Sequence, residues 1–264
     1  MSGQIRVANV DKRFPVPGGE IVALKGIDLD IRAGEFVCLL GPSGCGKSTL
    51  LNAIAGFSPP TAGTVTVDDR AVTGPGPDRG MVFQEYALFP WMTVADNVAF
   101  GLEIKGMARS DIDARVADLL AMLRLGEFRD RFPKDLSGGM RQRVAIARVL
   151  ALDSPVMLMD EPFGALDALT RRSLQDELLR IWSATGKTIV FVTHSIEDSI
   201  YLADRVVVLT YRPGTVKRDV TVSLPRPRDA STLPFNDLKR ELSLLVMEEQ
   251  QRHEAAEMAG LTTD

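Results

Sequence analysis

Residues 41–48, GPSGCGKS, have the types and the spacing that bind a polyphosphate, and we call them the phosphate loop. They fit the pattern G-x-x-x-x-G-K-[ST], whose glycines let backbone N–H groups curl around phosphate oxygens. We predict that Lys47 reaches the β- and γ-phosphates and that the Ser48 hydroxyl binds Mg²⁺. The alternative is an ordinary glycine-rich turn between a strand and a helix. The residues expected to contact the nucleotide are Gly41, Pro42, Ser43, Gly44, Cys45, Gly46, Lys47, Ser48 and Thr49.

Two adjacent carboxylates, Asp160 and Glu161, follow the apolar run 156–159. Ligands bind at the carboxyl ends of the strands in a parallel sheet, so we expect these acids to face the nucleotide. Asp160 is predicted to hold the metal ion, directly or through water. Glu161 is predicted to orient or deprotonate an attacking water, as a general base does. Many strands end in an acid that only caps the next helix, and the presence of the phosphate loop favours the catalytic interpretation.

The apolar runs of the chain predict the parallel sheet that would position these motifs. Phe36–Leu40 lies just before the phosphate loop and is apolar throughout, as in a strand buried on both faces. Strands that alternate with helices indicate βαβ units. Further strands are predicted at 156–159, 188–192 and 206–209, and helices at 49–56, 170–184 (ending near Gly186) and 196–203.

Three regions depart from this alternation. Residues 4–67 contain short alternating runs and a hairpin turn at 15–19, which predict antiparallel strands. Residues 93–152 contain helical patterns and no strand, so we expect an all-helical insertion. Beyond Pro225 we expect a C-terminal helix over residues 236–257 and frayed residues at 260–264. The N-terminal strands are expected at 4–10, 21–24, 27–31 and 64–67, and the helices of the insertion at 93–101, 111–125 and 137–152.

The combination of motifs points to a family. Residues 136–140, LSGGM, open the third helix of the insertion, between the phosphate loop and the acidic strand end. Here the chain resembles the nucleotide-binding subunits of ABC transporters, whose LSGGQ signature has this place, and Met140 stands where the family usually has Gln. The resemblance covers roughly residues 1–225 and is highly specific, because seven motifs follow the family's order. They are the phosphate loop, Gln84 after a strand, the signature, Asp160, Glu161, residues 165–167 and His194.

The resemblance implies an α/β fold, namely a P-loop NTPase with a RecA-like core and a mainly parallel sheet. It also implies an N-terminal antiparallel β-subdomain and an inserted all-helical subdomain, as in an ABC nucleotide-binding domain. We expect this domain over residues 1–225 and a C-terminal helical extension over residues 226–264. The core with its β-subdomain is expected at 1–84 and 153–225, and the helical subdomain at about 85–152.

The family also implies that two subunits pair head to tail around their ATP molecules. Ser137 and the amides of Gly138 and Gly139 would then contact the γ-phosphate held by the partner, since the start of a helix is a site for anions. Asp167 would bridge the two subunits at their seam. These residues also have a simpler interpretation, because Ser137 and Asp167 are both suited to capping the helix that follows.

Three further roles come from the resemblance. Gln84 would sense Mg²⁺ and the attacking water and would link the site to the helical insertion. His194 would contact the γ-phosphate, although a lone histidine is more often a structural hydrogen-bonding group. Phe14 would stack on adenine; the alternative is that Phe14 belongs to the hydrophobic core. The catalytic residues are thus expected to be Lys47, Gln84, Glu161 and His194, and the Mg²⁺ ligands Ser48, Gln84 and Asp160.

Composition limits the function classes. The 264 residues are 45% hydrophobic and carry a net charge of −4, which argues against a nucleic-acid partner. No run approaches the roughly 18 apolar residues of a membrane-spanning helix, and the N-terminus has no secretion signal. Two cysteines suit a reducing cytosol. One of them, Cys45, lies near a predicted helix start, where a thiol can have a lowered pKa and be redox-sensitive, but we expect it to be a small side chain that only fills space.

Residues 74–85 and 162–171 resemble the nitrate, sulfonate and taurine import branch of the family. The resemblance implies an ATPase subunit that uses ATP and Mg²⁺ at the cytoplasmic face of the inner membrane. Its partners would be a second ATP-binding subunit, integral membrane permease subunits and, indirectly, an extracytoplasmic solute-binding protein. The aromatic segment 84–91 would be core of the insertion or a groove for a cytoplasmic helix of the permease. The alternatives are a soluble ABC ATPase without transport, a P-loop kinase or GTPase, and an importer subunit for another solute class.

Overall fold

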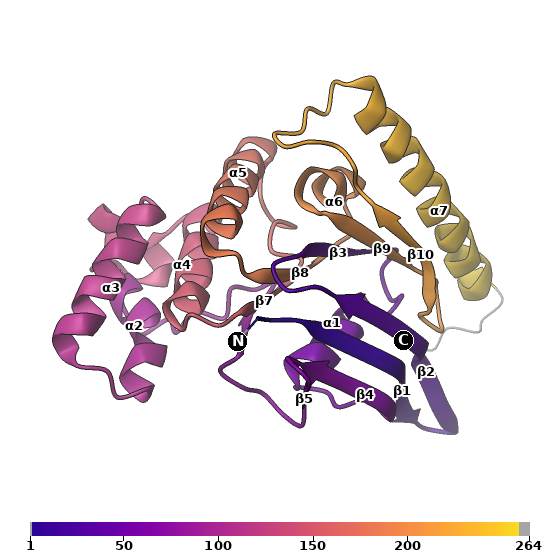
Figure 1. Ribbon diagram of the computed structural model, residues 1–264, viewed down its shortest axis with the longest axis horizontal. Helices are drawn as coiled ribbons and strands as arrows, with labels where there is room; N and C mark the ends of the chain where they lie inside the picture. The colour runs from indigo at the N-terminus through magenta and orange to yellow at the C-terminus, as the bar shows by residue number, and fades with distance from the viewer. Residues whose placement is uncertain (1, 259–264) are drawn as a thin grey trace. The chain divides into compact units, whose positions relative to one another are not determined.

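The computed structural model describes residues 2–258, which form two compact units. The first unit holds residues 2–76 and 188–258, and the second holds residues 77–187 (Figure 1). Both units contain strands and helices, so the predicted α/β class is confirmed. None of the helices within residues 2–258 combines the length and the apolar character needed to cross a membrane.

An antiparallel sheet in the first unit has the strand order β2-β1-β4-β5. The predicted hairpin turn is confirmed, because Gly18 between the first two strands has a φ of +91°. Residues 21–24 and 27–31, expected as two strands, belong to one, because Gly26 (φ +56°) lets the strand continue through an irregularity in its pairing. The strands are β1 (Ile5–Val16), β2 (Gly19–Ile31), β4 (Ala62–Val67) and β5 (Arg70–Ala71).

A second group of strands in the first unit has the order β10-β9-β3-β8. β3 (Phe36–Leu40) is parallel to both β8 (Thr188–Thr193) and β9 (Arg205–Leu209), and all five of its residues are buried. This burial on both faces explains the unbroken apolar run. The edge strand β10 (Val216–Thr221) was not predicted, because its sequence, VKRDVT, is polar and no residue in it is fully buried.

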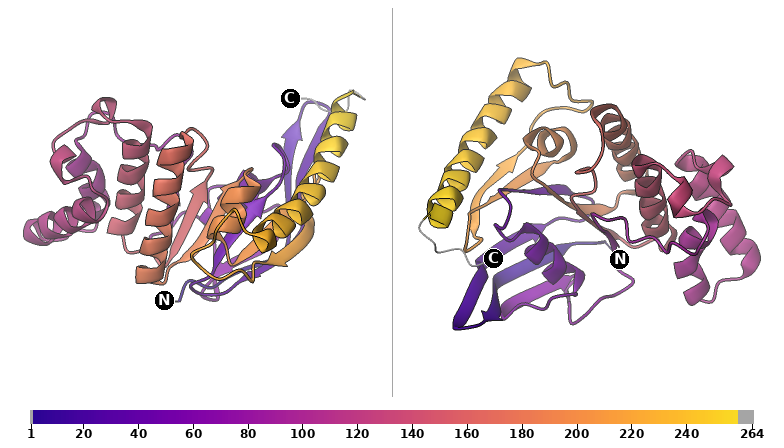
Figure 2. Two further views of the ribbon diagram at one scale, coloured as in Figure 1. Left: turned by 90° about the horizontal axis from the view of Figure 1, so that it is seen from above. Right: turned by 180° about the vertical axis from the view of Figure 1, so that it is seen from behind.

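Three helices complete the first unit. α1 (Lys47–Ala55) follows the phosphate loop, and α6 (Ile196–Leu202) follows β8. The C-terminal helix predicted at 236–257 is confirmed as α7 (Leu233–Met258), while the fraying expected at 260–264 lies outside the described residues. Both views in Figure 2 show α7 beside α6 and the β9–β10 hairpin, where Phe235 and Leu242 of α7 are buried.

The second unit joins a pair of parallel strands to a group of helices. β6 (Arg79–Val82) pairs with β7 (Val156–Asp160), and between them the chain contains helices and no strand, as predicted. Thr93 begins the first helix with a capping box, in which its hydroxyl accepts from Asp96 N. The elements are α2 (Val94–Ile104), α3 (Arg109–Met122), the 3₁₀ turns η1 (Gly126–Phe128) and η2 (Pro133–Asp135), α4 (Gly138–Ala151) and α5 (Ala168–Thr185).

Candidate functional site

The phosphate loop connects the buried strand β3 to α1, and its glycines are required by the backbone path. Gly44 and Gly46 have φ values of +74° and +98°, a region that side chains disfavour. A Cβ on Gly46 would also lie only 2.7 Å from Leu24 Cδ2 and 3.0 Å from Ala23 O. The loop is therefore a fixed, glycine-dependent curve and not an arbitrary turn.

Lys47 places a buried ammonium group inside this curve. Its side chain is 5% exposed, and Nζ donates to Gly41 O at 2.8 Å and to Pro42 O at 2.9 Å. Both acceptors are backbone carbonyls of the loop, so the positive charge faces the same backbone that would surround a phosphate. The next residue, Ser48, is half-buried in the first turn of α1.

Cys45 is buried within the loop, with Sγ at 3.8 Å from Lys47 Nζ. Burial raises the pKa of this thiol, and the nearby ammonium offsets that effect only in part. The alternative of a lowered pKa is therefore wrong, because loss of solvent outweighs the charge and the helix start. The expected role, a small side chain that fills space, agrees with the tight packing here, since a Cβ on Gly41 would lie only 2.8 Å from Cys45 Sγ.

Strand pairing brings His194 to the same end of the sheet as the phosphate loop. β3 and β8 are parallel neighbours, and Leu40 pairs with Thr193. The residues that follow, Gly41 and His194, therefore leave adjacent strands at their carboxyl ends, where ligands of parallel sheets bind. His194 is exposed and precedes Ser195, which caps α6 by accepting from Asp198 N.

Phe14 lies near the end of β1 and is 40% exposed, so its alternative as a core residue is wrong. Its ring is a flat apolar surface at the solvent boundary. The ammonium of Lys12 lies 5.0 Å from the ring centroid, within the range of a cation–π contact. The arrangement leaves an aromatic side chain that is able to stack on a base.

In the second unit, the loop after Gln84 is tied to the helix that carries the signature. Tyr86 and Ala87 adopt left-handed conformations, with φ of +63° and +47°. Arg148 of α4 holds them by donating to Ala87 O at 2.7 Å and to Tyr86 O at 3.2 Å. Sequence reasoning missed Arg148, although its place seven residues after Arg141 puts both arginines on one face of α4.

The signature residues form the start of α4, where Ser137 is exposed, Gly138 is half-buried and Gly139 is buried. Ser137 is the N-cap, and its hydroxyl accepts from Met140 N at 3.3 Å, so the capping interpretation is confirmed. A Cβ on Gly139 would lie 2.5 Å from Thr170 Cγ2 of α5, which requires glycine at that position. Hence the starts of α4 and α5 approach closely. A helix start of this kind presents backbone N–H groups to an anion.

Asp167 caps α5 in the same way. Its Oδ1 accepts from Leu169 N at 3.1 Å and from Thr170 N at 3.0 Å. The hydrogen bond from Thr170 and its neighbours lowers the pKa of this exposed carboxyl, which keeps it ionised. The expected capping role is confirmed, and it leaves the second carboxylate oxygen with capacity for another partner.

The two acids after β7 differ in backbone conformation. Asp160 is the last residue of the strand, and Glu161 has a φ of +42°, which is uncommon for a residue with a side chain. Gly164 N donates to Glu161 O at 3.2 Å and closes this turn. Strained residues of this type often lie at functional sites, because surrounding structure must hold them there.

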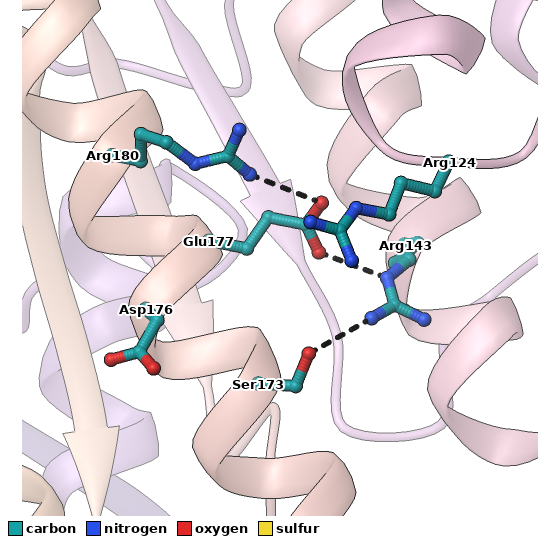
Figure 3. A pocket seen from close by; sticks show the side chains of 6 residues that line it. All are labelled: Arg124, Arg143, Ser173, Asp176, Glu177 and Arg180. Carbon is teal, nitrogen blue, oxygen red and sulfur yellow. Dashed lines mark hydrogen bonds and ion pairs between the residues drawn. The ribbon is translucent and has the colours of Figure 1, made fainter.

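A cavity of about 400 Å³ lies between α4, α5 and the loop after α3 (Figure 3). Within it, Glu177 is almost fully buried and accepts from Arg143 Nε at 2.9 Å, while Arg180 lies 3.6 Å away. Arg143 Nη2 also donates to Ser173 at 3.5 Å. These contacts hold the signature helix against α5. The cavity is lined by Arg124, Arg143, Ser173, Asp176, Glu177 and Arg180.

The chemistry of the predicted metal ligands suits Mg²⁺. Ser48, Asp160 and Gln84 offer hydroxyl, carboxylate and amide oxygen atoms, which are hard donors. Magnesium usually takes only one or two protein ligands beside substrate phosphates and water. The residues present therefore fit this ion.

Comparisons with known proteins agree with these motifs. The sequence model of the ABC transporter family matches residues 24–164. A nitrate import ATP-binding protein of Synechocystis is 47% identical over 237 residues, 90% of this chain and 89% of that protein. A taurine import ATP-binding protein of Roseobacter denitrificans is 47% identical over 235 residues, 89% of this chain and 84% of that protein.

Solved structures give the same answer for the fold. A dimeric post-hydrolysis state of an ATP-binding cassette, bound to ADP and phosphate, matches with a TM-score of 0.75. It is 35% identical, and the match covers 84% of this chain and 100% of the other. The chain therefore belongs to the ABC transporter family, and its fold is that of an ABC ATP-binding cassette.

Proposed function

We propose that this chain is the ATP-hydrolysing subunit of a membrane importer for a small anionic solute of the nitrate, sulfonate or taurine type. The observation that carries the proposal is the phosphate loop, which holds the buried Lys47 ammonium and leaves the sheet beside His194. The relatives named for nitrate and taurine import support this solute class over the alternatives, a soluble ABC ATPase or an importer subunit for another class.

Residues of the first unit bind ATP. The amides of residues 41–49 surround the β- and γ-phosphates, and Lys47 exchanges its two carbonyl acceptors for phosphate oxygens. Phe14 stacks on adenine, which its exposed ring permits. His194 donates a hydrogen bond to the γ-phosphate from the end of β8. These contacts spread the charge that develops during phosphoryl transfer over fixed donors.

Residues of the second unit carry out hydrolysis. Glu161 orients the attacking water and takes up its proton, and its left-handed backbone conformation is of a kind often found at functional sites, which supports this role. Gln84 positions the same water, and Arg148 couples its loop to the signature helix. Mg²⁺, held by Ser48, Asp160 and Gln84, would neutralise charge on the β- and γ-phosphates.

A second copy of the chain completes each site. The start of α4, with the exposed Ser137 and the amides of Gly138 and Gly139, contacts the γ-phosphate held by the partner, and Asp167 bridges the two chains. The dimeric state of the similar cassette supports this assembly. ATP drives closure because its γ-phosphate contacts the partner chain only in the closed dimer.

The helical part of the second unit offers a surface for the permease. Phe89 and Phe100 pack at a centroid distance of 4.6 Å, and Trp91, at 5.8 Å from Phe89, is 71% exposed. An exposed tryptophan beside half-buried rings favours a docking surface for a cytoplasmic helix over a closed core. The subunit would thus act at the cytoplasmic face of the inner membrane, and a solute-binding protein would join through the permease.

We divide the chain accordingly. Residues 1–225 are the nucleotide-binding domain, with the core and β-subdomain at 1–84 and 153–225 and a helical subdomain at about 85–152. Residues 226–264 are an extension that contains α7. The stretch between β6 and β7 contains the helices α2, α3 and α4 and no strand, which supports the helical subdomain.

A transport assay tests the solute class. The chain is reconstituted in vesicles with a permease and a solute-binding protein of the nitrate and taurine import type, and uptake of nitrate, taurine and an alkanesulfonate is measured with ATP inside. We expect ATP-dependent uptake of at least one of these anions. Uptake of a sugar or a basic amino acid instead would overturn the solute assignment, and ATP hydrolysis in the assembled vesicles without uptake of any of these solutes would overturn the importer role.

A further inference from the structure

The turn between β9 and β10 packs directly against the phosphate loop. Gly214 N donates to Ala23 O at 2.9 Å, and Lys25 N donates to Gly214 O at 3.0 Å, which joins the turn to β2. A Cβ on Gly214 would lie only 2.3 Å from Cys45 O. The turn and the phosphate loop therefore touch through backbone atoms, with no room for a side chain between them.

This contact places Arg212 beside the glycine at the middle of the phosphate loop. A Cβ on Gly44 would lie 3.7 Å from Arg212 Nη2 and 3.8 Å from Tyr211 Cε2. Arg212 is exposed, and within the part of the chain that the structure describes no carboxylate forms an ion pair with it. Its positive charge is thus uncompensated next to a loop built for a polyanion.

The turn itself is held in one conformation by its two flanking threonines. Thr210 N donates to Thr215 O at 3.0 Å, and Thr215 N donates to Thr210 Oγ1 at 2.9 Å. Thr210 Oγ1 also donates to Pro213 O at 2.8 Å. These bonds close the turn, so Arg212 projects from a fixed base.

The C-terminal helix α7 anchors the same turn. Glu249 is fully buried, and its Oε2 accepts from Tyr211 N at 2.9 Å while its Oε1 accepts from Lys217 Nζ at 2.7 Å. The His253 ring stacks on Tyr211 with a centroid distance of 4.3 Å. Glu249 and His253 of α7 thus hold Tyr211, the residue next to Arg212, by a hydrogen bond and by ring stacking.

We propose that Arg212 is a further nucleotide-binding residue, and that α7 positions it through Glu249 and His253. Its charge adds to that of Lys47 and favours ATP over nucleotides with fewer phosphates. The inference rests on the proposed binding of ATP by the phosphate loop. It also assigns a role to α7, which otherwise lies outside the nucleotide-binding domain.

Titration of ATP against the full-length chain tests the charge. Arg212→Ala should weaken ATP binding about three- to tenfold at low salt, and the difference should shrink in about 0.5 M salt, where a charge at this distance is screened. The loss should be smaller for AMP. Arg212→Lys should restore most of the affinity, and Arg218→Ala, which removes an exposed arginine from β10, should bind ATP like the wild type.

A double-mutant cycle tests the anchoring by α7. His253→Ala should weaken ATP binding in the same salt-dependent way but to a smaller extent, by raising KM for ATP without lowering kcat. In the Arg212→Ala background it should have no further effect, because the positioned charge is already gone. If His253→Ala weakened ATP binding equally in both backgrounds and independently of salt, His253 would have a purely structural role. That result would overturn the positioning of Arg212 by α7.

The outcomes separate this inference from the proposed function. Unchanged ATP affinity in Arg212→Ala at low salt, while Lys47→Ala fails to bind, overturns only the role of Arg212. Unchanged binding in Lys47→Ala overturns the phosphate loop assignment itself. Melting temperatures of all variants, with Arg218→Ala as the reference, exclude loss of folding as the cause.

Discussion

The phosphate loop and the signature, both of which we propose to contact phosphates through backbone N–H groups, differ in how the fold supports them. The loop holds Lys47 buried inside it, and the turn 211–214 packs against its backbone. At the starts of α4 and α5, the capping residues Ser137 and Asp167 are exposed. Under the proposed function, the loop binds a nucleotide within one chain, whereas the start of α4 acts on the nucleotide that the partner chain presents.

The largest effect on ATP binding is expected at Lys47. Lys47→Ala should reduce ATP affinity of the isolated chain by at least about 100-fold, because a charge-assisted contact to the phosphates is lost. Equilibrium binding of a fluorescent ATP analogue measures this. Lys187→Ala is a matched control, since it removes another buried lysine, which pairs with Asp153 in the second unit. Wild-type ATP affinity in Lys47→Ala would contradict the role of the phosphate loop as the nucleotide-binding site.

Glu161 should affect turnover and not binding. Glu161→Gln should lower ATP hydrolysis in the reconstituted complex by about 10²–10⁴-fold, the usual contribution of a general base. ATP should remain bound, and a closed dimer should accumulate, because the γ-phosphate that holds it together is not removed. Size-exclusion chromatography with ATP detects the dimer. Wild-type turnover in this variant would rule out the general-base role.

The close approach of α4 and α5 predicts an effect of intermediate size on the stability of the fold. Gly139→Ala should destabilise the fold by about 1–3 kcal/mol, because its Cβ would meet Thr170 Cγ2 at 2.5 Å. Thr170→Ser removes that methyl group, so the double variant should regain most of the lost stability. Chemical denaturation measures both. Equal destabilisation with and without Thr170→Ser would show that the two helix starts are not in contact as described.

The smallest expected effect is a pH dependence of the α7 anchor. Burial opposes ionisation of Glu249, but hydrogen bonds from Lys217 and from the Tyr211 N–H lower its pKa below the ordinary value of 4.5. Its contribution to stability is therefore complete above pH 4.5 and is lost as the pH falls through the lower pKa of the folded state. Melting curves between pH 3 and 7 should show this loss. A Glu249→Gln variant should lack that part of the pH dependence.

Local sequence patterns predicted the elements that carry the motifs. The apolar run of β3, the glycines of the phosphate loop and the caps at Ser137 and Asp167 depend on neighbouring residues alone, and the structure contains them where expected. β10 was missed because an edge strand needs no apolar pattern. The alternative of a lowered pKa for Cys45 is wrong because burial depends on packing and not on position in the loop.

The amino-acid sequence by itself determined the family and the order of its motifs along the chain. It also determined the curvature of the phosphate loop and the helix starts, since these depend on glycines and capping residues close by in the chain. Only the tertiary structure decided which distant residues support them. Arg148 reaches the loop after Gln84 across more than sixty positions, and Arg212 lies beside Gly44 across an even longer separation. Such contacts depend on how strands and helices pack, and no local pattern of residue types encodes that packing.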